Sequence, residues 1–196
     1  MMQQMVPMPG VRLRPARPFS STGMDYAGPF MIRCSAGRGQ KRLKGYVSFF
    51  ICMVTKAVHL EVVSNLTSEA FLAAFRRFVA RRGLCKVMHS DNGTNFRGTA
   101  TESDRLFSEA SSFSHEVAEV LALGQVEWSF IPARSPSFRG LWETNVKSFK
   151  HHLYRAIGEA KLTYKEFSTV CASIEACLNL RPLCVLKLRP HKSHTQ

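Results

Sequence analysis

Two apolar runs joined by only two residues constrain the fold most strongly. They read YVSFFICMV and AVHLEVV, and Thr55 and Lys56 join them. Such β-branched and aromatic runs are typical of paired strands. The earlier stretch GMDYAGPF predicts a shorter strand that closes at Gly28 and Pro29, followed by a Gly-rich basic turn over residues 33–45. We therefore expect an antiparallel meander of three strands.

An amphipathic helix is predicted directly after this meander, over residues 67–83. Thr67 can cap it, Glu69 lies where the helix dipole favours a carboxylate, and Gly83 can end it. Apolar residues at helical spacing should form a buried stripe made up of Phe71, Leu72, Phe75, Phe78 and Val79. Four arginines are left largely on the opposite side: Arg76, Arg77, Arg81 and Arg82.

Two further strands are separated by a stretch of weak periodicity. The run CKVMHSD predicts a short strand that delivers Asp91 to its end, and VEWSFIP predicts a fifth strand. Residues 98–124, rich in Ser, Glu and Ala, indicate one or two helices. The stretch 133–140 is expected to be a loop.

The last two helices carry clearer signals. From Leu141 onward, apolar residues recur at helical spacing, namely at Trp142, Val146, Phe149, Leu153 and Ile157. The final helix should begin at a capping box formed by Thr163 and Glu166. It should stop at Arg181, because Pro182 follows.

The element order is therefore βββαβ, an irregular segment and then βαα, which indicates an α/β fold of five strands flanked by helices. A chain of 196 residues has room for one such domain. We expect an extended, basic, proline-containing arm over 1–20, a core over 21–183 and an unrelated, disordered tail over 184–196.

The charge of the chain favours a polyanionic partner. Lys and Arg outnumber Asp and Glu 27 to 14, which gives a net charge of +13, while 45% of the residues are hydrophobic. A folded basic domain points first to nucleic acid and second to an anionic membrane surface. Charge that serves only solubility is the plain alternative.

The cysteines and the N-terminal stretch bear on the compartment. Six cysteines lie in apolar segments, with no C-x-x-C pair and no metal-like pairing with histidines, and are expected to be buried thiols of a reducing compartment: Cys34, Cys52, Cys85, Cys171, Cys177 and Cys184. The N-terminus lacks the apolar stretch typical of a signal peptide, and no apolar run is long enough to span a bilayer. We therefore expect an intracellular protein that is not secreted and has no membrane partner.

Three acidic residues lack an ordinary explanation. Asp25 lies in a strand that is otherwise small and apolar, Asp91 lies at a strand end, and Glu143 lies at a helix start. The other acidic residues lie at helix ends, on strands or on expected solvated faces. These three are therefore the candidates for chemistry.

Glu143 begins a basic helix face. Lys147 and Lys150 follow at i+4 and i+7, with His151 and Tyr154 close to the same face. Glu143 alone is an ordinary first-turn glutamate favoured by the dipole, and with Lys147 it is an ordinary surface ion pair. A carboxylate at one end of a basic stripe is also what a site that handles phosphate needs.

Two-metal phosphoryl transfer links the three carboxylates. Two divalent ions about 3.5–4 Å apart activate a hydroxyl or water and stabilise the leaving oxygen, and hard oxygen ligands hold them. Carboxylates from a central strand, an adjacent strand end and a facing helix could converge on such a pair. Magnesium suits them because it keeps waters and takes substrate phosphate as a ligand.

Five stretches carry a family resemblance: FSSTGMDYAGPF, KAVHLEVVSNLTSEAFLAAFRRFVARRG, SDNGTNFRG, FIPARSPSFRGLWETNVKSFKHHL and LTYKEFSTVCASIEACLNLRPL. Together they resemble the catalytic core of retroviral and LTR-retrotransposon integrases, specifically of the BEL/Pao type. The resemblance spans roughly residues 18–183, with the order of elements intact. It implies an RNase H-like fold with a mixed five-stranded sheet.

The resemblance also implies roles for individual residues. Asp25, Asp91 and Glu143 match the catalytic acidic triad that binds two Mg²⁺ or Mn²⁺ ions. Gly140 is the expected hinge of a mobile loop before the catalytic helix. The expected DNA contacts are Lys147, Lys150, His151, Arg139 and Asn92.

The implied reaction is cleavage near the 3′ ends of element DNA, followed by attack of the new 3′-hydroxyl on target DNA. A homo-oligomer acting in the nucleus is expected. The sequence departs from the family in having no C-x-x-C for a zinc module, an unrelated tail, and Arg139 where the loop usually has a second glycine. An isolated or truncated core is therefore expected, its rivals being a catalytically silent, retrotransposon-derived DNA-binding or interaction module and a ribonuclease H proper.

Overall fold

The computed structural model of the chain describes five segments, namely residues 16–35, 41–91, 126–131, 136–158 and 160–180. For residues 91, 130, 131 and 136–139 it describes the backbone alone. The helices predicted within 98–124, the tail over 184–196 and most of the arm lie outside the described residues.

Five strands form one mixed sheet, as the sequence predicted. They are β1 (Ser21–Arg33), β2 (Arg42–Cys52), β3 (Val58–Val63), β4 (Val87–Asp91) and β5 (Glu127–Ile131). Across the sheet the order is β3-β2-β1-β4-β5. The first three strands form the predicted antiparallel meander, and β4 and β5 run parallel to β1. The longest strand, β1, is therefore central.

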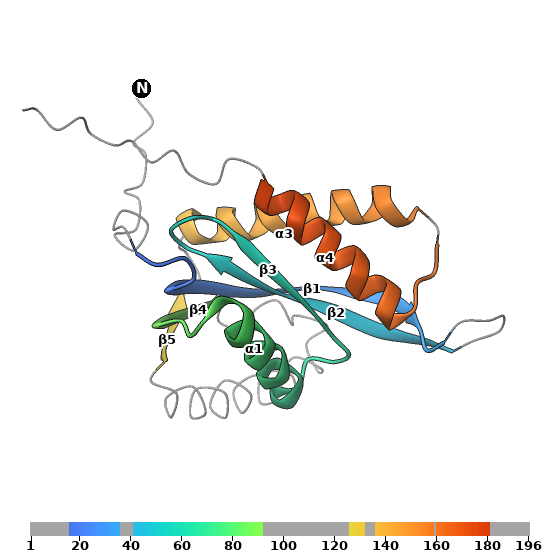
Figure 1. The fold of residues 1–196 in the computed structure, drawn as a ribbon, viewed down its shortest axis with the longest axis horizontal. Helices are drawn as coiled ribbons and strands as arrows, with labels where there is room; N and C mark the ends of the chain where they lie inside the picture. Colours follow the sequence, from blue (N-terminus) through green and yellow to red (C-terminus); the bar gives the residue numbers. More distant parts are fainter. Residues whose placement is uncertain (1–15, 36–40, 92–125, 132–135, 159, 181–196) are drawn as a thin grey trace, which may run out of the picture.

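Helices cover both faces of this sheet (Figure 1): α1 (Ser68–Arg82) on one, and α3 (Pro136–Ile157) and α4 (Tyr164–Leu180) on the other. Side chains of β2 alternate between the two layers, so Phe50 packs with α1 while Phe49 and Ile51 pack with α3 and α4. This double coverage explains why β2 is buried on both faces from Val47 to Cys52 and, apart from Ser48, is apolar at every position there.

The helix ends follow the sequence signals. The Thr67 side chain accepts a hydrogen bond from the Ala70 N–H, and Gly83 ends α1 with φ 82°. Thr163 and Glu166 form the predicted capping box, in which the Thr163 N–H donates to the Glu166 carboxylate at 2.7 Å. These two starts are confirmed.

The prediction that the first strand closes at Gly28 and Pro29 is wrong, since β1 continues to Arg33. Its register with β2 shifts at these two residues, where Gly28 adopts φ 144°. An irregularity of this kind lets a strand absorb a proline, and glycine tolerates the positive φ. Beyond the shift Ile32 is buried and Phe30 packs against the same core, so burial carries the strand onward.

The folded domain also takes in residues from the predicted arm. Phe19 is buried, with its ring 5.5 Å from that of Phe78. Arg17 donates a hydrogen bond to the Arg82 carbonyl oxygen near the end of α1.

Cys34 and Cys177 are exposed, against the expectation of buried thiols, whereas Cys52, Cys85 and Cys171 are buried. No helix within the described segments is long and apolar enough to cross a membrane.

Candidate active site

The two predicted aspartates occupy adjacent positions in the β1–β4 pair. Met24 is paired with Ser90 in the parallel register, and the next residues along the two strands are Asp25 and Asp91. Neighbouring strands lie about 4.8 Å apart, so the two backbones bring these residues next to one another. The register thus brings the backbones of two of the three predicted acidic residues to neighbouring positions of the sheet.

Asp25 lies on the sheet face that α3 covers. Gly23 precedes Asp25 by two residues and therefore shares its face, and Trp142 of α3 packs directly on Gly23. His89 is paired with Gly23 in the register and precedes Asp91 by two residues.

The surroundings of Asp25 are partly defined. The residue is half-buried, and its Oδ1 accepts a hydrogen bond from the Tyr26 backbone N–H at 2.8 Å. Asp91 is the last residue of β4, opposite Ile131 of β5, and its side chain lies outside the described part. Asn92, a predicted DNA contact, also lies outside it.

Glu143 is exposed on α3, directly after the buried Trp142. It lies beyond the first turn, because α3 begins at Pro136, so a first-turn role does not account for it. Within the described residues it makes no ion pair, so the pairing with Lys147 does not account for it either.

The predicted loop over 133–140 is wrong from Pro136 onward, because those residues are helical. Proline is favoured in the first helical turn, where its missing N–H costs no bond. Gly140 lies inside α3, and its carbonyl oxygen accepts a hydrogen bond from the Thr144 hydroxyl at 2.6 Å. Gly140, which was predicted to be the hinge of a loop, therefore lies within a helix.

The basic face predicted on this helix is open to solvent. Lys147, Lys150 and His151 are exposed, and Tyr154 is 61% exposed. Among the described side chains, neither lysine has an ion-pair partner. Of Arg139 only the backbone is described, at a position in the first turn of α3.

The donor set fits a divalent ion by its chemistry and backbone placement. Carboxylate oxygens are the hard ligands that Mg²⁺ and Mn²⁺ take, and two of them come from adjacent strand positions under the helix that bears Glu143. No group of three His, Cys, Asp or Glu side chains among the described residues could hold a metal, and the Asp91 side chain is not one of those described.

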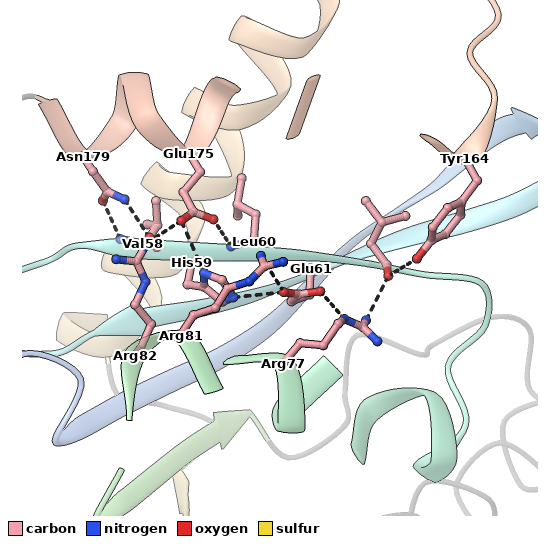
Figure 2. Close-up of polar contacts among 11 residues, drawn as sticks. Val58, His59, Leu60, Glu61, Arg77, Arg81, Arg82, Tyr164, Glu175 and Asn179 are labelled. Atoms are coloured by element: carbon pink, nitrogen blue, oxygen red, sulfur yellow. Dashed lines mark hydrogen bonds and ion pairs between the residues drawn. The ribbon is translucent and has the colours of Figure 1, made fainter. Parts of the chain in front are cut away.

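A second charged cluster lies at the edge strand β3 (Figure 2). His59 lies between Glu61 and Glu175, with Nε2 3.1 Å from Glu61 and Nδ1 3.3 Å from Glu175. From α1, two arginines pair with Glu61 and one with Glu175, namely Arg77, Arg81 and Arg82. The cluster joins α1, β3 and α4.

Pairing governs protonation in this cluster. Burial alone would lower the pKa of His59, but hydrogen bonds to Glu175 and Glu61 outweigh it and raise the pKa. Burial alone would raise the pKa values of Glu61 and Glu175, but hydrogen bonds to His59 and to the arginines lower both. Pairing therefore favours the charged form of each of these three groups.

Side chains of α4 also bond the outer edge of β3 (Figure 2). Asn179 exchanges two hydrogen bonds with the Val58 backbone, each 2.8 Å long. Glu175 accepts one from the Leu60 N–H, and the Tyr164 hydroxyl donates one to the Val62 carbonyl oxygen. The edge strand is thus paired on both sides.

Sequence reasoning missed this cluster and misplaced its arginines. Arg77, Arg81 and Arg82 were expected largely on the side of α1 away from the core, yet each has an ion-pair partner on β3 or α4. The available signal was the pair of polar residues at His59 and Glu61 in an otherwise apolar strand. Because β3 lies two strands from β1, the cluster is separate from the aspartates.

The fold is RNase H-like, the class to which the catalytic cores of retroviral integrases belong. No protein-family model matches the chain, and no curated protein matches it in sequence. The similarity to solved structures is therefore one of fold.

Two of these structures are the HTLV-2 integrase catalytic core domain in complex with magnesium. The trimeric form has a TM-score of 0.58 at 16% identity, covering 88% of this chain and 93% of that one. The dimeric form has a TM-score of 0.52 at 16% identity, covering 86% and 91%. A simian T-cell lymphotropic virus intasome, in complex with PP2A regulatory subunit B56 gamma, contains a chain matched at TM-score 0.55 and 14% identity. The match covers 83% of this chain and about half, 49%, of that chain.

Proposed function

We propose that the chain is a Mg²⁺- or Mn²⁺-dependent polynucleotidyl transferase core of integrase type, which processes 3′ ends of element DNA and joins them to target DNA. The observation that carries this proposal is the register that sets the backbone of Asp91 beside Asp25, whose side chain lies on the face covered by α3, the helix of Glu143. Acidic residues on neighbouring strands suit the two-metal mechanism.

Each group has a separate task in this mechanism. Two metal ions, when bound, supply the activation of the attacking oxygen and the stabilisation of the leaving oxygen. Asp25 and Asp91 would hold them from β1 and β4, and Glu143 from α3. The backbone N–H of Tyr26 donates a hydrogen bond to one oxygen of Asp25 and helps to orient the carboxylate.

DNA would lie along the exposed face of α3. Lys147, Lys150 and His151 offer positive or hydrogen-bonding groups to phosphates, and Arg139 and Asn92 would extend these contacts. Neither lysine has an ion-pair partner within the described residues, which favours this role because both ammonium groups are then accessible to a polyanion.

The experiment is Mn²⁺-dependent nicking and disintegration of a branched DNA substrate, with wild type compared against Asp91→Asn. We expect product from the wild type alone. Equal product from both proteins, or none from either, would exclude the catalytic proposal.

The second candidate is a catalytically silent DNA-binding module, favoured by the same open basic face, which needs no metal. It predicts that wild type and Asp91→Asn bind branched DNA equally and that neither cuts it. Binding and cleavage measured on the same preparation therefore separate the two candidates.

The finer proposals concern origin, assembly and location. The motifs from FSSTGMDYAGPF to LTYKEFSTVCASIEACLNLRPL support a BEL/Pao-type retrotransposon origin. The HTLV-2 cores, solved as dimeric and trimeric forms with magnesium, support a homo-oligomer and a divalent ion here. Action on chromosomal DNA would place the protein in the nucleus.

A further inference from the structure

Gly23 and Trp142 bring β1 and α3 into close contact. A Cβ atom on Gly23 would lie 2.5 Å from Nε1 and 3.0 Å from Cε2 of Trp142, and 3.1 Å from Sδ of Met53. The indole is only 3% exposed. Because no side chain fits between these atoms, the helix approaches the strand this closely only where residue 23 is glycine.

The contact lies beside two predicted metal ligands. Gly23 precedes Asp25 by two residues on the same strand face, and Trp142 directly precedes Glu143. Glu143 is exposed and makes no ion pair within the described residues, so the backbone of α3 determines where it lies. Trp142 anchors that backbone against β1 at the residue before the glutamate.

We propose that Gly23 and Trp142 are positioning residues, which set how far α3 stands from the two aspartates and thereby whether Glu143 can share their metal ions. This inference depends on the proposed function. Neither residue is a metal ligand, and each acts through the carboxylate that follows it. A role confined to packing would alter stability and leave metal affinity unchanged.

The test uses the full chain with Gly23→Ala, Trp142→Phe and the double variant. Each is measured for its Mn²⁺ dissociation constant without DNA, by water-proton relaxation, and for its free energy of unfolding in urea. Gly23→Ala should bind Mn²⁺ about tenfold more weakly, as for lost outer support of a metal site. Trp142→Phe should also bind more weakly, because the smaller ring leaves the helix less well anchored.

The double variant is the sharpest measurement. The added methyl group should fill space that the smaller ring leaves, so the double variant should bind Mn²⁺ more tightly than either single one. Trp142→Phe removes no hydrogen bond of the described residues, because the buried Nε1 of Trp142 has no acceptor among them. Additive losses in the double variant would overturn the inference.

Gly45→Ala is the matched control. Gly45 is a buried glycine of β2, where a Cβ would lie 2.1 Å from Cδ1 of Ile32, and it is aligned with Phe30 beyond the β1 register shift. It should lose stability and keep wild-type Mn²⁺ affinity. Wild-type Mn²⁺ affinity in a folded Gly23→Ala variant would overturn the inference, and so would an equal loss of Mn²⁺ affinity in Gly45→Ala. Either result would leave the proposed function standing.

Two further outcomes complete the test. If Gly23→Ala does not fold, Trp142→Phe decides, and wild-type affinity in that variant would overturn the inference. Wild-type protein that binds no Mn²⁺, or binds it no better than Asp25→Asn, would overturn the proposed function and this inference with it.

Discussion

At the edge strand β3, each buried carboxylate meets positive charge: Glu61 contacts His59 and two arginines of α1. At the β1–β4 pair, Asp25 and Asp91 instead come together from adjacent strands. Opposite charges in contact stabilise the folded chain, whereas like charges brought near one another repel until a cation joins them. The first arrangement is expected to contribute to stability and the second to function, and this difference can be tested one residue at a time.

The largest effect is expected from Asp25→Asn. Metal-dependent nicking of branched DNA should fall to background, because a neutral amide is a poor ligand for Mg²⁺. The free energy of unfolding should stay at the wild-type value or rise, since an amide oxygen can still accept the Tyr26 N–H and a negative charge is removed. Residual cutting, or a large loss of stability in urea, would place Asp25 among the structural residues.

Glu61→Gln should show the reverse pattern. Removing one partner of a buried, paired set leaves His59 and Arg77 without full compensation, and the free energy of unfolding should fall by about 3–5 kcal/mol. Glu69→Gln, an exposed glutamate in the first turn of α1, serves as control and should lose less than about 1 kcal/mol. Equal losses in urea denaturation would contradict the contrast.

The basic face of α3 should matter for binding alone. Lys147→Ala and Lys150→Ala should each reduce the salt slope of DNA affinity by about 0.9, because each removes one phosphate contact. Lys165→Ala, an exposed lysine on α4, should leave the slope unchanged. Fluorescence anisotropy over a salt series measures the slope for all three variants. An equal change of slope in Lys165→Ala would show that net charge, and not the face of α3, determines the effect.

The smallest effect is a pH dependence of stability. The raised pKa of His59 contributes stability that is fully present below 6.5, the ordinary value, and is lost as pH rises through the folded-state pKa. Glu61 and Glu175, whose pKa values are lowered, contribute above 4.5 and lose that contribution on acidification. Wild-type stability should therefore decline from pH 6.5 toward about 8.5, where thiols begin to titrate.

His59→Gln should abolish this decline. His89→Gln should retain it, because burial lowers the pKa of His89 and its effect has the opposite sign, costing stability as pH falls below 6.5. Urea unfolding across this pH range measures both variants. A decline that survives in His59→Gln would show that another group carries it.

Local signals predicted the elements well, because caps and apolar runs act within a few residues. The capping box at Thr163 and the order of the five strands along the chain came from such signals. The continuation of β1 past Pro29 could not be predicted, because burial of Ile32 depends on α3 and α4 lying above it. The partners of Arg77 were hidden for the same reason, since Glu61, 16 residues earlier in the chain, meets Arg77 only once α1 packs against β3.

The candidate site divides along the same line. Placing Asp91 at a strand end needed only the local pattern, and the register then set it beside Asp25. The start of α3 at Pro136 was missed because loop-forming residues outweighed a proline that suits a first helical turn. The role of Gly23 depends on an indole from a helix far along the chain, which no local spacing reveals.

The hydrogen bonds that α4 makes to Val58, Leu60 and Val62 have a consequence for self-association. An open edge strand can recruit a strand of another molecule and begin aggregation. Here the outward backbone groups of β3 are already occupied by Asn179, Glu175 and Tyr164. A second chain could extend the sheet past β3 only by displacing these side chains. We therefore expect α4 to protect this edge strand against intermolecular strand pairing of the kind that builds amyloid.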